Sequence, residues 1–540
     1  FLAANFPTKG WFPIGSWSDV SSVVFYGNFD GAGYSVNGLW INRPTLPFVG
    51  LFSEVRQGEI KNLSVNIDAS KGVRGGNMGA GGLIGCINGA TVTNCNVTGG
   101  GVFGEPTSKV RAGGLIGTAS FSVIRNCYAT SDVYGNEYVG VLCGFATETA
   151  IENCYATGNV EGEIYAGGLA GFSYADDVSE GVVNCYASGK VSGKHCCGIV
   201  GYGFCITNCI ALNASIEGTV SGTKNMGRVN GYDDISIELS NNYALSNMRV
   251  YDQTTGTDVT LRKGADKKDG ADISVSESLN KDTYTNRLGW NFTSVWYMES
   301  GKYPVLRYQV FGYGSGSIDD PYLIRTPQQL DNIRNFLGAA YKDTYWKLAC
   351  DIDLSSYLTS GEGWSPIGGS EAFYGHLDGD GHVIKGLWMN KTNTEYVGLF
   401  SRLAANSEVK NLGIIIADGK EVLGKKLCRC SCRRAVRQHH KRLLYRQVRG
   451  ELFSGGTIGG YNVGGLVGYQ SGGNTQNCYT VGEVIGNENI GGLTGNLNGG
   501  TITKCYSNSY VTAFTLGGGL VGYNKGSITS CYAIGKIETW

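Results

Sequence analysis

Hydrophobic and polar residues alternate over short stretches of this chain with the period of β-strands. In residues 151–157 (IENCYAT) one set of alternate positions holds Ile151, Asn153 and Tyr155, and the other holds Glu152, Cys154 and Ala156. A period of two residues indicates a strand rather than a helix. Each such stretch follows a glycine-rich stretch, which suits tight bends and a close approach between neighbouring backbones.

A block of Gly-Gly-Leu-x-Gly, followed about ten residues later by Asn-Cys-Tyr, recurs along the chain. Its copies span residues 81–96, 113–130, 139–158, 167–189, 197–212, 464–482, 491–507 and 518–535. A repeat of this size cannot bury its apolar face alone and stacks on its neighbours. With roughly 24 to 32 residues between repeat cysteines, we predict an all-β, right-handed parallel β-helix-like solenoid with coils about 4.8 Å apart. The 85 glycines disfavour helical repeats.

The chain contains 17 cysteines, a number that in a secreted protein suggests disulfides. Eight of them occupy one position of the coil: Cys95, Cys127, Cys154, Cys185, Cys209, Cys478, Cys505 and Cys531. Side chains stacked on parallel strands point the same way, which makes disulfide geometry hard to reach. We therefore predict a column of buried thiols rather than disulfides or metal ligands. The preceding asparagines predict a second column, hydrogen-bonded from coil to coil: Asn94, Asn126, Asn153, Asn184, Asn208 and Asn477.

Composition narrows the function classes. The chain has 540 residues, of which 42% are hydrophobic and 16% charged, and its formal net charge is −1. Such a balance gives no reason to expect a nucleic-acid partner. No apolar run reaches the length that crosses a bilayer, so we predict no membrane insertion.

Long segments of the chain occur twice, most of them at a spacing of 348 residues. Residues 25–33 (FYGNFDGAG) return as 373–381 (FYGHLDGDG), and residues 49–53 return as 397–401. We predict two modules of one type joined by a glycine- and serine-rich linker. They span residues 1–310 and 319–540, with the linker at 311–318.

The second module contains a beginning that the first lacks. In residues 326–329 a threonine N-cap is followed by proline and, three residues after the cap, by glutamine. Leu330 and Ile333 continue at helical spacing, so we predict a short helix that covers the open end of the second module. The first module ends in apolar segments at 288–292 and 303–306 without a counterpart in the second. We therefore expect the first module to be truncated at its N-terminus and the second at its C-terminus.

The GGLxG…NCYxxG pattern resembles the GLUG motif of bacterial surface proteins. The resemblance extends to Asp-Pro-Tyr-Leu-Ile at 320–324, to Cys-Asp-Ile-Asp-Leu at 350–354 and to Trp-x-Pro-Ile-Gly. It implies a secreted, adhesin-like protein; the same repeats also accompany immunoglobulin-A-specific metallopeptidases. The chain departs from the pattern where Lys504 and Ser530 replace asparagine, and in a coil near 227–244 that has no cysteine.

Residues 425–449 do not fit the repeat. They hold ten of the 44 basic residues and two of the five histidines. One interpretation is a zinc site formed by Cys428, Cys430, Cys432, His439 and His440; others are a basic patch for nucleic acid or an insertion without special function. We favour a frameshift. If the gene is translated from the second base of each codon, suitable codon choices restore a missing repeat, and its glycine and cysteine then lie 14 residues apart, as Gly113 and Cys127 do. The chain from Val463 onward should then stack on the coil that ends near Val422.

Signatures of catalysis are absent from the sequence: it has no HExxH, no G-x-S-x-G and no P-loop. Residues 378–382 (DGDGH) offer carboxylates for calcium or acid–base chemistry, but the first module keeps only Asp30 there, which favours a turn. His195 with Cys196 and Cys197 suggests a metal site, yet Cys197 stands at a repeat glycine, which favours sequence drift. We predict no catalytic residue, no cofactor and no metal site.

The tyrosines of the Cys-Tyr pairs are the candidate ligand-facing residues. On a strand they point opposite to the cysteines, so they form a stripe on the outside of the rod that suits contact with sugars or proteins. Stabilisation of the sheet by ring stacking is the alternative. The six residues are Tyr128, Tyr155, Tyr186, Tyr479, Tyr506 and Tyr532.

These observations predict a non-catalytic, extracellular protein of the bacterial cell surface that presents its solenoid to glycans or to host or matrix proteins. One alternative is a β-helix carbohydrate-active enzyme, which needs paired carboxylates facing one groove. The exposed acids, such as Glu152 and Glu180, scatter between repeats without a recurring pair. The other alternative is the repeat region of a larger secreted peptidase.

Overall fold

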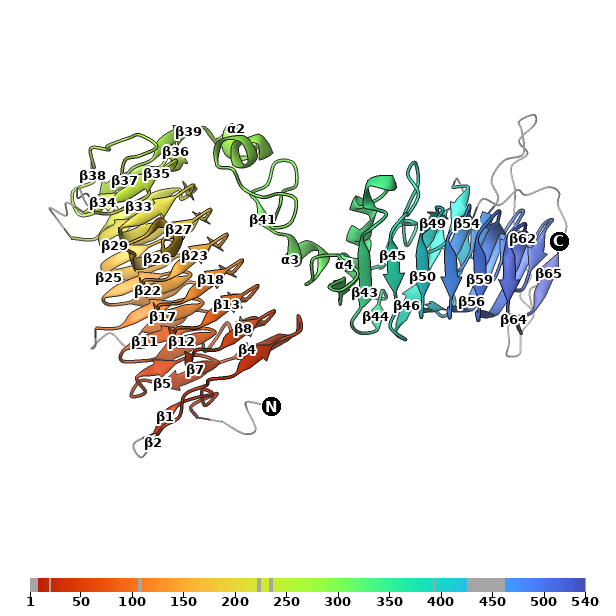
Figure 1. Ribbon diagram of the computed structural model, residues 1–540, viewed down its shortest axis with the longest axis horizontal. Coiled ribbons are helices and arrows are strands. Elements are labelled where there is room, and N and C mark those ends of the chain that lie inside the picture. Colours follow the sequence, from red (N-terminus) through yellow and green to blue (C-terminus); the bar gives the residue numbers. More distant parts are fainter. Residues whose placement is uncertain are drawn as a thin grey trace. The chain divides into compact units, whose positions relative to one another are not determined.

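The computed structural model of the chain describes residues 8–18, 21–104, 109–220, 225–232, 237–391, 394–424 and 462–539. Most of its regular structure is parallel β-sheet. The chain divides into two compact units, Phe1–Gln309 and Val310–Trp540. Within each unit the strands of successive coils lie side by side, as the rows of arrows in Figure 1 show. The predicted all-β parallel solenoid is confirmed.

One coil of the first unit consists of four strands joined by tight corners. In residues 150–174 these are β23 (Ala150–Glu152), β24 (Tyr155–Ala156), β25 (Val160–Gly167) and β26 (Ala170–Tyr174). They pair in parallel with β18 (Val123–Arg125), β19 (Tyr128–Ala129), β21 (Tyr138–Gly140) and β22 (Cys143–Thr147) of the preceding coil. On the other side they pair with β27 (Val182–Val183), β28 (Tyr186–Ala187), β29 (Val191–Cys197) and β30 (Val200–Gly203).

Repetition of this coil builds the sheets of the first unit. An eight-stranded sheet runs from β3 (Asn28–Asp30) to β35 (Glu238–Ser240), and a nine-stranded sheet runs from β4 (Ser35–Leu39) to β39 (Ala271–Ile273). A six-stranded sheet runs from β7 (Phe52–Arg56) to β30, and a fourteen-stranded sheet includes β25 and β29. Equivalent cysteines of neighbouring coils are 27 and 31 residues apart in this region, within the predicted period.

The corners explain why glycine and asparagine recur. A Cβ atom on Gly167 would lie 1.9 Å from the carbonyl oxygen of Ala170, so only glycine fits the turn from β25 into β26. Asn153 has a φ of 52°, in the left-handed region that asparagine tolerates better than most residues. The chain therefore turns at Asn153 from β23 into β24, and the continuous strand predicted over 151–157 is wrong. Ile151 and Cys154, which one strand would place on opposite faces, are both fully buried.

Aliphatic side chains aligned from coil to coil fill the interior. Ile124, Ile151, Val182 and Ile206 are successive register partners and none of them is exposed. Burying one such side chain stabilises the fold by roughly 1.5–3 kcal/mol. Because the column is continuous, each coil completes the core of its neighbours.

Arg228 fills the interior at the last coils of the first unit. Its side chain is fully buried, and its Nη1 lies 2.7 Å from Asp272 Oδ1. The guanidinium also donates to the carbonyl oxygens of Leu245, Asp269 and Gly270. A buried charge satisfied in this way closes the end of the apolar core with polar groups.

Residues 275–309 leave the coils and fold over the nine-stranded sheet; we call them the cover. The cover contains α2 (Val275–Ser278), the π-helical turn η2 (Thr283–Arg287), β40 (Trp296–Tyr297), β41 (Val305–Leu306) and the start of α3 (Arg307–Phe311). β40 and β41 pair antiparallel. Ser274 and Glu277 form a capping box at the start of α2.

The second unit begins with β42 (Tyr322–Ile324) and α4 (Pro327–Asp331). The Thr326 side chain accepts a hydrogen bond from the Gln329 backbone N–H at 3.2 Å, as the predicted N-cap requires. Leu330 and Ile333 are fully buried. The predicted capping helix is therefore confirmed, although it is only one turn long and continues as a 3₁₀ turn, η3 (Asn332–Asn335).

The predicted linker is part of the second unit rather than a free spacer. Phe311 and Tyr313 are only 1% and 6% exposed. The Phe311 ring meets the Phe336 ring edge-on, with centroids 4.2 Å apart. The aromatic residues of the predicted linker thus pack against the start of the second unit.

The coils of the second unit stack directly across the break in the described residues at 425–461. β48 (Tyr396–Val397) pairs with β53 (Asn462–Gly464), β49 (Phe400–Leu403) with β54 (Val467–Gln470), and β52 (Val422–Leu423) with β56 (Tyr479–Gly486). Asn411 and Asn477 occupy neighbouring coils although they are 66 residues apart in sequence. The predicted resumption of stacking is confirmed. The frameshift, zinc and nucleic-acid interpretations of 425–449 lie outside the described residues.

Candidate functional site

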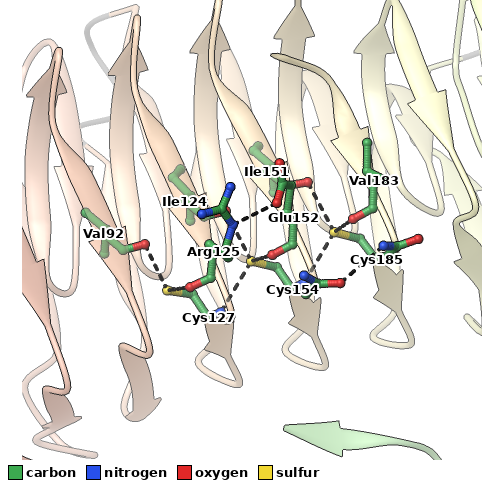
Figure 2. Close-up of polar contacts among 11 residues, drawn as sticks. Val92, Ile124, Arg125, Cys127, Ile151, Glu152, Cys154, Val183 and Cys185 are labelled. Atoms are coloured by element: carbon green, nitrogen blue, oxygen red, sulfur yellow. Dashed lines mark hydrogen bonds and ion pairs between the residues drawn. The ribbon is translucent and has the colours of Figure 1, made fainter. Parts of the chain in front are cut away.

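The repeat cysteines form an internal column of thiols. Cys127, Cys154 and Cys185 are fully buried in successive coils and carry no disulfide. The Cys127 backbone N–H donates to Cys154 Sγ at 3.3 Å, and the Cys154 N–H donates to Cys185 Sγ at 3.4 Å (Figure 2). The thiol of Cys154 faces the Glu152 carbonyl oxygen at 3.1 Å. These cysteines satisfy backbone groups at the corner and fill the core, as predicted for buried thiols.

The column ends where asparagine replaces cysteine. Asn242, which is fully buried, accepts from the Cys209 backbone N–H at 2.9 Å and donates to the Ile206 carbonyl oxygen at 2.7 Å. The cysteines make the same two types of contact. The coil that lacks cysteine is therefore complete, because a side-chain amide provides the missing acceptor and donor.

The asparagines form a second column at the corner. Asn94 donates to Asn62, Asn184 to Asn153 and Asn477 to Asn411, at 2.9–3.2 Å between Nδ2 and Oδ1. The predicted hydrogen bonds between coils are confirmed for these pairs. All of these asparagines have positive φ values, and so do Lys504 and Ser530, which replace asparagine in the last coils.

An aspartate starts each asparagine column. Asp30 Oδ1 accepts from the Ala32 backbone N–H at 2.8 Å and from Asn62 Nδ2 at 3.0 Å. Asp378 does the same in the second unit, for the Asp380 N–H at 2.8 Å and for Asn411 at 2.9 Å. This geometry supports the turn predicted for residues 378–382, because the carboxylate is occupied by the turn and by the ladder.

The predicted ligand-facing tyrosines of the first unit form a ring stack on the outside of the coils. The centroids of Tyr128 and Tyr155 are 4.9 Å apart, and those of Tyr155 and Tyr186 are also 4.9 Å apart, with ring planes within 2°. Stacked rings use their faces against each other, which leaves edges and hydroxyls for other contacts. The stack therefore supports the sheet, as the alternative interpretation held.

The cover buries Tyr155 and Tyr186, so the prediction that these two tyrosines face a ligand is wrong, whereas Tyr128 is partly exposed and its role stays a prediction. Tyr155 and Tyr186 are only 4% and 2% exposed. The Tyr186 hydroxyl donates to the Pro304 carbonyl oxygen at 2.8 Å, and the Tyr155 hydroxyl lies 2.7 Å from Nε2 of Gln309. The ring of Trp296 lies 6.4 Å from Tyr155 and 6.2 Å from Tyr186, measured between centroids. The alternation of residues along a strand could not predict this burial, because the covering residues are more than 100 positions away in the sequence.

Further contacts hold the cover in register with the coils. Trp290 Nε1 donates to the Asn208 carbonyl oxygen at 2.9 Å, and Asn241 Nδ2 donates to the Arg287 carbonyl oxygen at 2.7 Å. Trp290 stacks on Trp296 at 4.5 Å. Burial beneath the cover raises the pKa of Tyr128 to about 12, and it raises the pKa values of Tyr155 and Tyr186 above the ordinary tyrosine value. These hydroxyls therefore stay protonated at neutral pH.

The matching tyrosines of the second unit remain accessible. Tyr479 and Tyr506 stack at 4.9 Å, and Tyr506 and Tyr532 at 5.1 Å. Tyr479 and Tyr506 are partly exposed, and Tyr532 is 55% exposed. The same column thus has two environments, covered in the first unit and open among the described residues of the second.

A second aromatic surface, which the sequence analysis missed, lies at another corner of the first unit. Phe145 stacks on Phe172 at 4.6 Å and Phe172 on Tyr202 at 5.4 Å. Beside them Tyr138 stacks on Tyr165 at 5.3 Å, and Tyr138 meets Phe172 edge to face at 5.2 Å. We call these five residues the aromatic strip, and all five are partly exposed.

Two details define the surroundings of the aromatic strip. The guanidinium of Arg111 lies 3.9 Å from the centroid of Phe145, so a cation covers one end of the phenylalanine stack. His195 continues the tyrosine column, 5.1 Å from Tyr165. The sequence does contain a pattern that indicates the aromatic strip. An aromatic residue directly follows Leu-x-Gly or Ile-Val-Gly once per coil, at Phe145, Phe172 and Tyr202.

His195, Cys196 and Cys197, which were considered for metal chemistry, do not point to one site. His195 lies beside Tyr165 on the outside, whereas Cys196 and Cys197 are fully buried. Cys196 donates to the Glu217 carbonyl oxygen at 3.3 Å. In the described part of the chain, no group of three or more His, Cys, Asp or Glu side chains is placed to hold a metal ion.

One carboxylate pair does come together from separate coils. A hydrogen bond between Glu148 and Glu180 raises the pKa of Glu180, and Asp176 and Asp177 raise it further. The Asp176 backbone N–H donates to Glu148 at 3.3 Å. Glycosidase carboxyl groups stand roughly 5–9.5 Å apart to admit water or a sugar carbon, whereas these two groups are in direct contact. This arrangement differs from the paired carboxylates that sugar hydrolysis uses.

Comparisons with known proteins connect the repeats to a family. The sequence profile of the GLUG motif matches residues 110–134 and 135–161. A protein of Evansella cellulosilytica named "Putative Gly-rich membrane protein" is 44% identical over 107 residues, which cover 19% of this chain and 12% of that protein. "Halomucin" of Haloquadratum walsbyi is 32% identical over 147 residues, which cover 26% of this chain and 1% of that protein. The chain thus spans only a small part of the length of either relative.

A solved structure shares part of its fold length with this chain. The crystal structure of a "putative immunoglobulin A1 protease" from Bacteroides ovatus covers 56% of this chain and 83% of its own, at 18% identity. The TM-score between the two structures is 0.38. Among the described residues, no helix has the length and apolar character to cross a bilayer. The resemblance predicted from the sequence is confirmed by the profile: the chain carries GLUG-motif repeats, folded as coils of a parallel β-solenoid.

Proposed function

We propose that this chain is a non-catalytic, extracellular surface protein whose solenoid presents an attachment surface to glycans or to host or matrix proteins. The observation that carries the proposal is the aromatic strip. Its rings repeat once per coil on an outer corner and remain partly exposed. Aromatic residues are enriched at recognition surfaces, because they bury much apolar area and tyrosine adds a hydroxyl.

The strip is rigid before a ligand arrives. Tyr138 and Tyr165 are fixed by stacking on each other and by edge contacts with Phe172 and Tyr202. Side chains that are already ordered lose little conformational entropy on binding, which raises affinity for a given contact area. An extended ligand lying along the solenoid would meet the same contact in successive coils.

The names of the relatives support the proposed location. One is named a Gly-rich membrane protein and the other halomucin. A stacked solenoid suits such a location, because parallel sheets that run along the unit hold successive binding rings at fixed spacing.

The test is binding of the full chain to a glycan array and to a panel of matrix proteins. Replacing Tyr138 and Tyr165 by alanine should weaken attachment at least about tenfold, as expected for aromatic anchors. Arg125→Ala, on the exposed face of β18 in another sheet, is the control and should bind normally. Failure of the unaltered chain to bind any glycan or matrix protein would remove the attachment function.

The alternative of a carbohydrate-active enzyme is tested through Glu148 and Glu180. The full chain is incubated with plant and host polysaccharides, and the release of reducing ends is measured. Release that is abolished by Glu180→Gln would favour the enzyme and contradict the non-catalytic proposal. The contact between the two carboxyl groups leads us to expect no release.

A further inference from the structure

A positively charged side chain stands at one end of the aromatic strip. The guanidinium of Arg111 lies 3.9 Å from the centroid of the Phe145 ring, and the residue is partly exposed. In the described part of the chain, this guanidinium makes no hydrogen bond or ion pair. Its planar N–H groups are therefore available to an anion from outside. Other arginines that lie over rings donate from the guanidinium to carbonyl oxygens or carboxylates: Arg43, Arg74, Arg249, Arg334 and Arg402.

The aromatic strip holds this guanidinium in a fixed plane. Arg111 and Thr118 belong to the coil that precedes Phe145, and their register partners in the next coil are Tyr138 and Phe145. Phe172 stacks on one face of Phe145, so the guanidinium occupies the other face, on the side of Thr118. A guanidinium that is already oriented by a ring loses little conformational entropy when it binds a carboxylate.

A buried hydroxyl on the same side of Phe145 also lacks a partner. Thr118 is only 5% exposed, and its Oγ1 has no hydrogen-bond partner in the described structure. The hydroxyl faces Gly79 of the preceding coil, because a Cβ atom there would lie 3.2 Å from it. Leaving a buried hydroxyl without a partner is costly. An anion bound between Arg111 and Gly79 would supply the missing acceptor.

Positive charge also lies at the far end of the aromatic strip. Arg111, Tyr138, Tyr165 and His195 are successive register partners, so they span three coil spacings of about 4.8 Å each. Lys194 is exposed, and its charge adds to burial in lowering the pKa of His195. The strip therefore has a cation at each end and tyrosine hydroxyls between them, which is complementary to an anionic chain that lies along the solenoid.

Two acidic side chains near Arg111 leave its charge available. Glu54 is only 2% exposed and is bound to Arg56 at 2.6 Å. Glu137 precedes Tyr138 in the sequence and makes no ion pair with Arg111 in the described structure. The positive charge at this end of the strip is therefore not neutralised by the nearest carboxylates.

We propose that Arg111 and the aromatic strip bind an acidic polysaccharide. The carboxylate of one sugar would accept hydrogen bonds from the Arg111 guanidinium and the Thr118 hydroxyl, and the following sugars would meet the hydroxyls of Tyr138 and Tyr165. This inference rests on the proposed attachment function and names the class of its ligand.

The spacing of the strip favours a polysaccharide over an acidic protein. In an extended polysaccharide with equatorial linkages, each sugar advances the chain by nearly one coil spacing, so one sugar meets one tyrosine hydroxyl per coil. Side chains on one face of an extended peptide repeat roughly every 6.6–6.8 Å, out of step with coils about 4.8 Å apart. The rings of Tyr138 and Tyr165 stack on each other, so ligand contacts go through hydroxyls and ring edges.

The experiment measures binding of a fluorescently labelled oligomannuronate to the full chain by fluorescence anisotropy at low ionic strength. The oligomer is long enough to span the strip, and the neutral oligosaccharide of mannose with the same linkage and length is its counterpart. We expect the neutral oligomer to bind at least about tenfold more weakly. Arg111→Gln should weaken binding of the oligomannuronate about ten- to a hundredfold, because it removes hydrogen bonds between charged groups. Arg111→Lys keeps the charge without the planar fork and should lose less.

Two further variants locate the anion. Thr118→Val removes the hydroxyl at nearly constant volume and should weaken binding about two- to tenfold. Arg74→Gln is the matched control, because the Arg74 guanidinium also lies over a stacked ring, 3.7 Å from the centroid of Phe103, but outside the strip. This variant should bind as the unaltered chain does.

The outcomes separate this inference from the attachment function. Equal binding of the neutral and acidic oligomers, unchanged binding by Arg111→Gln, or an equal loss in Arg74→Gln would overturn the acidic ligand. Binding of polyglutamate that Arg111→Gln weakens to the same extent would identify an acidic protein as the ligand, and would also overturn it. Attachment to neutral glycans that requires Tyr138 and Tyr165 would then still support the proposed function, whereas failure to bind any glycan or matrix protein would remove both.

Discussion

Removal of the Trp296 side chain tests whether the cover is a separate, detachable element of the first unit. Trp296 is fully buried between the cover and the tyrosine stack, against Tyr155, Tyr186 and Trp290. Truncation of a buried tryptophan to alanine costs about 3–5 kcal/mol. The remaining anchors are the buried side chains of Trp290 and Leu306 and hydrogen bonds such as Tyr186 to Pro304, each hydrogen bond worth about 1 kcal/mol. The loss should therefore appear mainly as opening of the cover.

Hydrogen–deuterium exchange with peptide-level mass spectrometry measures this opening. In Trp296→Ala, amides of residues 295–309 should exchange about a hundredfold to a few thousandfold faster, because each 1.4 kcal/mol changes the open population about tenfold. Strands at the far end of the unit, such as β12 (Ile84–Asn88), should keep their protection. Burial raises the pKa values of Tyr155 and Tyr186, so in the variant both hydroxyls should ionise at lower pH than in the unaltered chain, seen by ultraviolet titration.

Trp296→Phe is the matched control. In the described structure Trp296 Nε1 is buried without a hydrogen-bond partner, so phenylalanine removes volume but no polar contact. It should shift exchange far less than alanine does. If the alanine variant instead loses protection evenly across all coils, or leaves residues 295–309 as protected as before, the cover is not a separate element and the reasoning fails.

Three further predictions concern the columns inside the solenoid. Lys504→Asn should stabilise the second unit by about 1–2 kcal/mol in chemical denaturation, because asparagine tolerates the left-handed backbone at this corner and can hydrogen-bond to Asn477. Lys504→Gly should give only the part of this gain that comes from the backbone. A loss of stability in both variants would contradict the argument. Arg228→Ala should destabilise the first unit by about 3–5 kcal/mol, measured by thermal unfolding, since it leaves buried carbonyl groups without donors. Burial raises the pKa of Cys95 to about 12 and that of Cys185 above the ordinary thiol value. Neither thiol should therefore react with iodoacetamide in the native protein at pH 8, and both should react after denaturation. Rapid labelling of the native protein would show that the coils open.

The coil itself could be predicted because its pattern is local. The distance from the repeat glycines to the cysteine, and the distance to the next cysteine, fix one coil and its stacking partner. The left-handed turn at Asn153 was not predicted, because a single residue with a positive φ leaves no periodic pattern in the sequence. Its effect is that the side chains of Ile151 and Cys154 both point into the core. An asparagine at the same position of most repeats is the trace that it leaves in the sequence.

The environment of the tyrosines could not be predicted, because it depends on contacts between distant parts of the chain. The sequence correctly places Tyr155 and Tyr186 opposite to the cysteines, on the outside of the coils. It does not show that Pro304 and Gln309 return to meet their hydroxyls. The aromatic strip was overlooked for a different reason: its rings precede and follow the Gly-Gly corner, so they become neighbours only when the chain turns there.

The two units together show how one repeat can serve two purposes. A stacked tyrosine column stabilises a sheet in either unit, since the ring contacts at 4.9 Å are the same. What differs is the outer edge of the column: hydroxyls that bond to the cover contribute to folding, and hydroxyls left accessible can bond to another molecule. The repeat fixes the spacing of the tyrosine rings whether or not another segment lies over them. The presence of a cover therefore determines whether the tyrosine column only supports the fold or is also accessible for recognition. A recognition surface on this solenoid is therefore best sought at rings that stay partly exposed although coils stack on both sides of them, as Phe172 does between Phe145 and Tyr202.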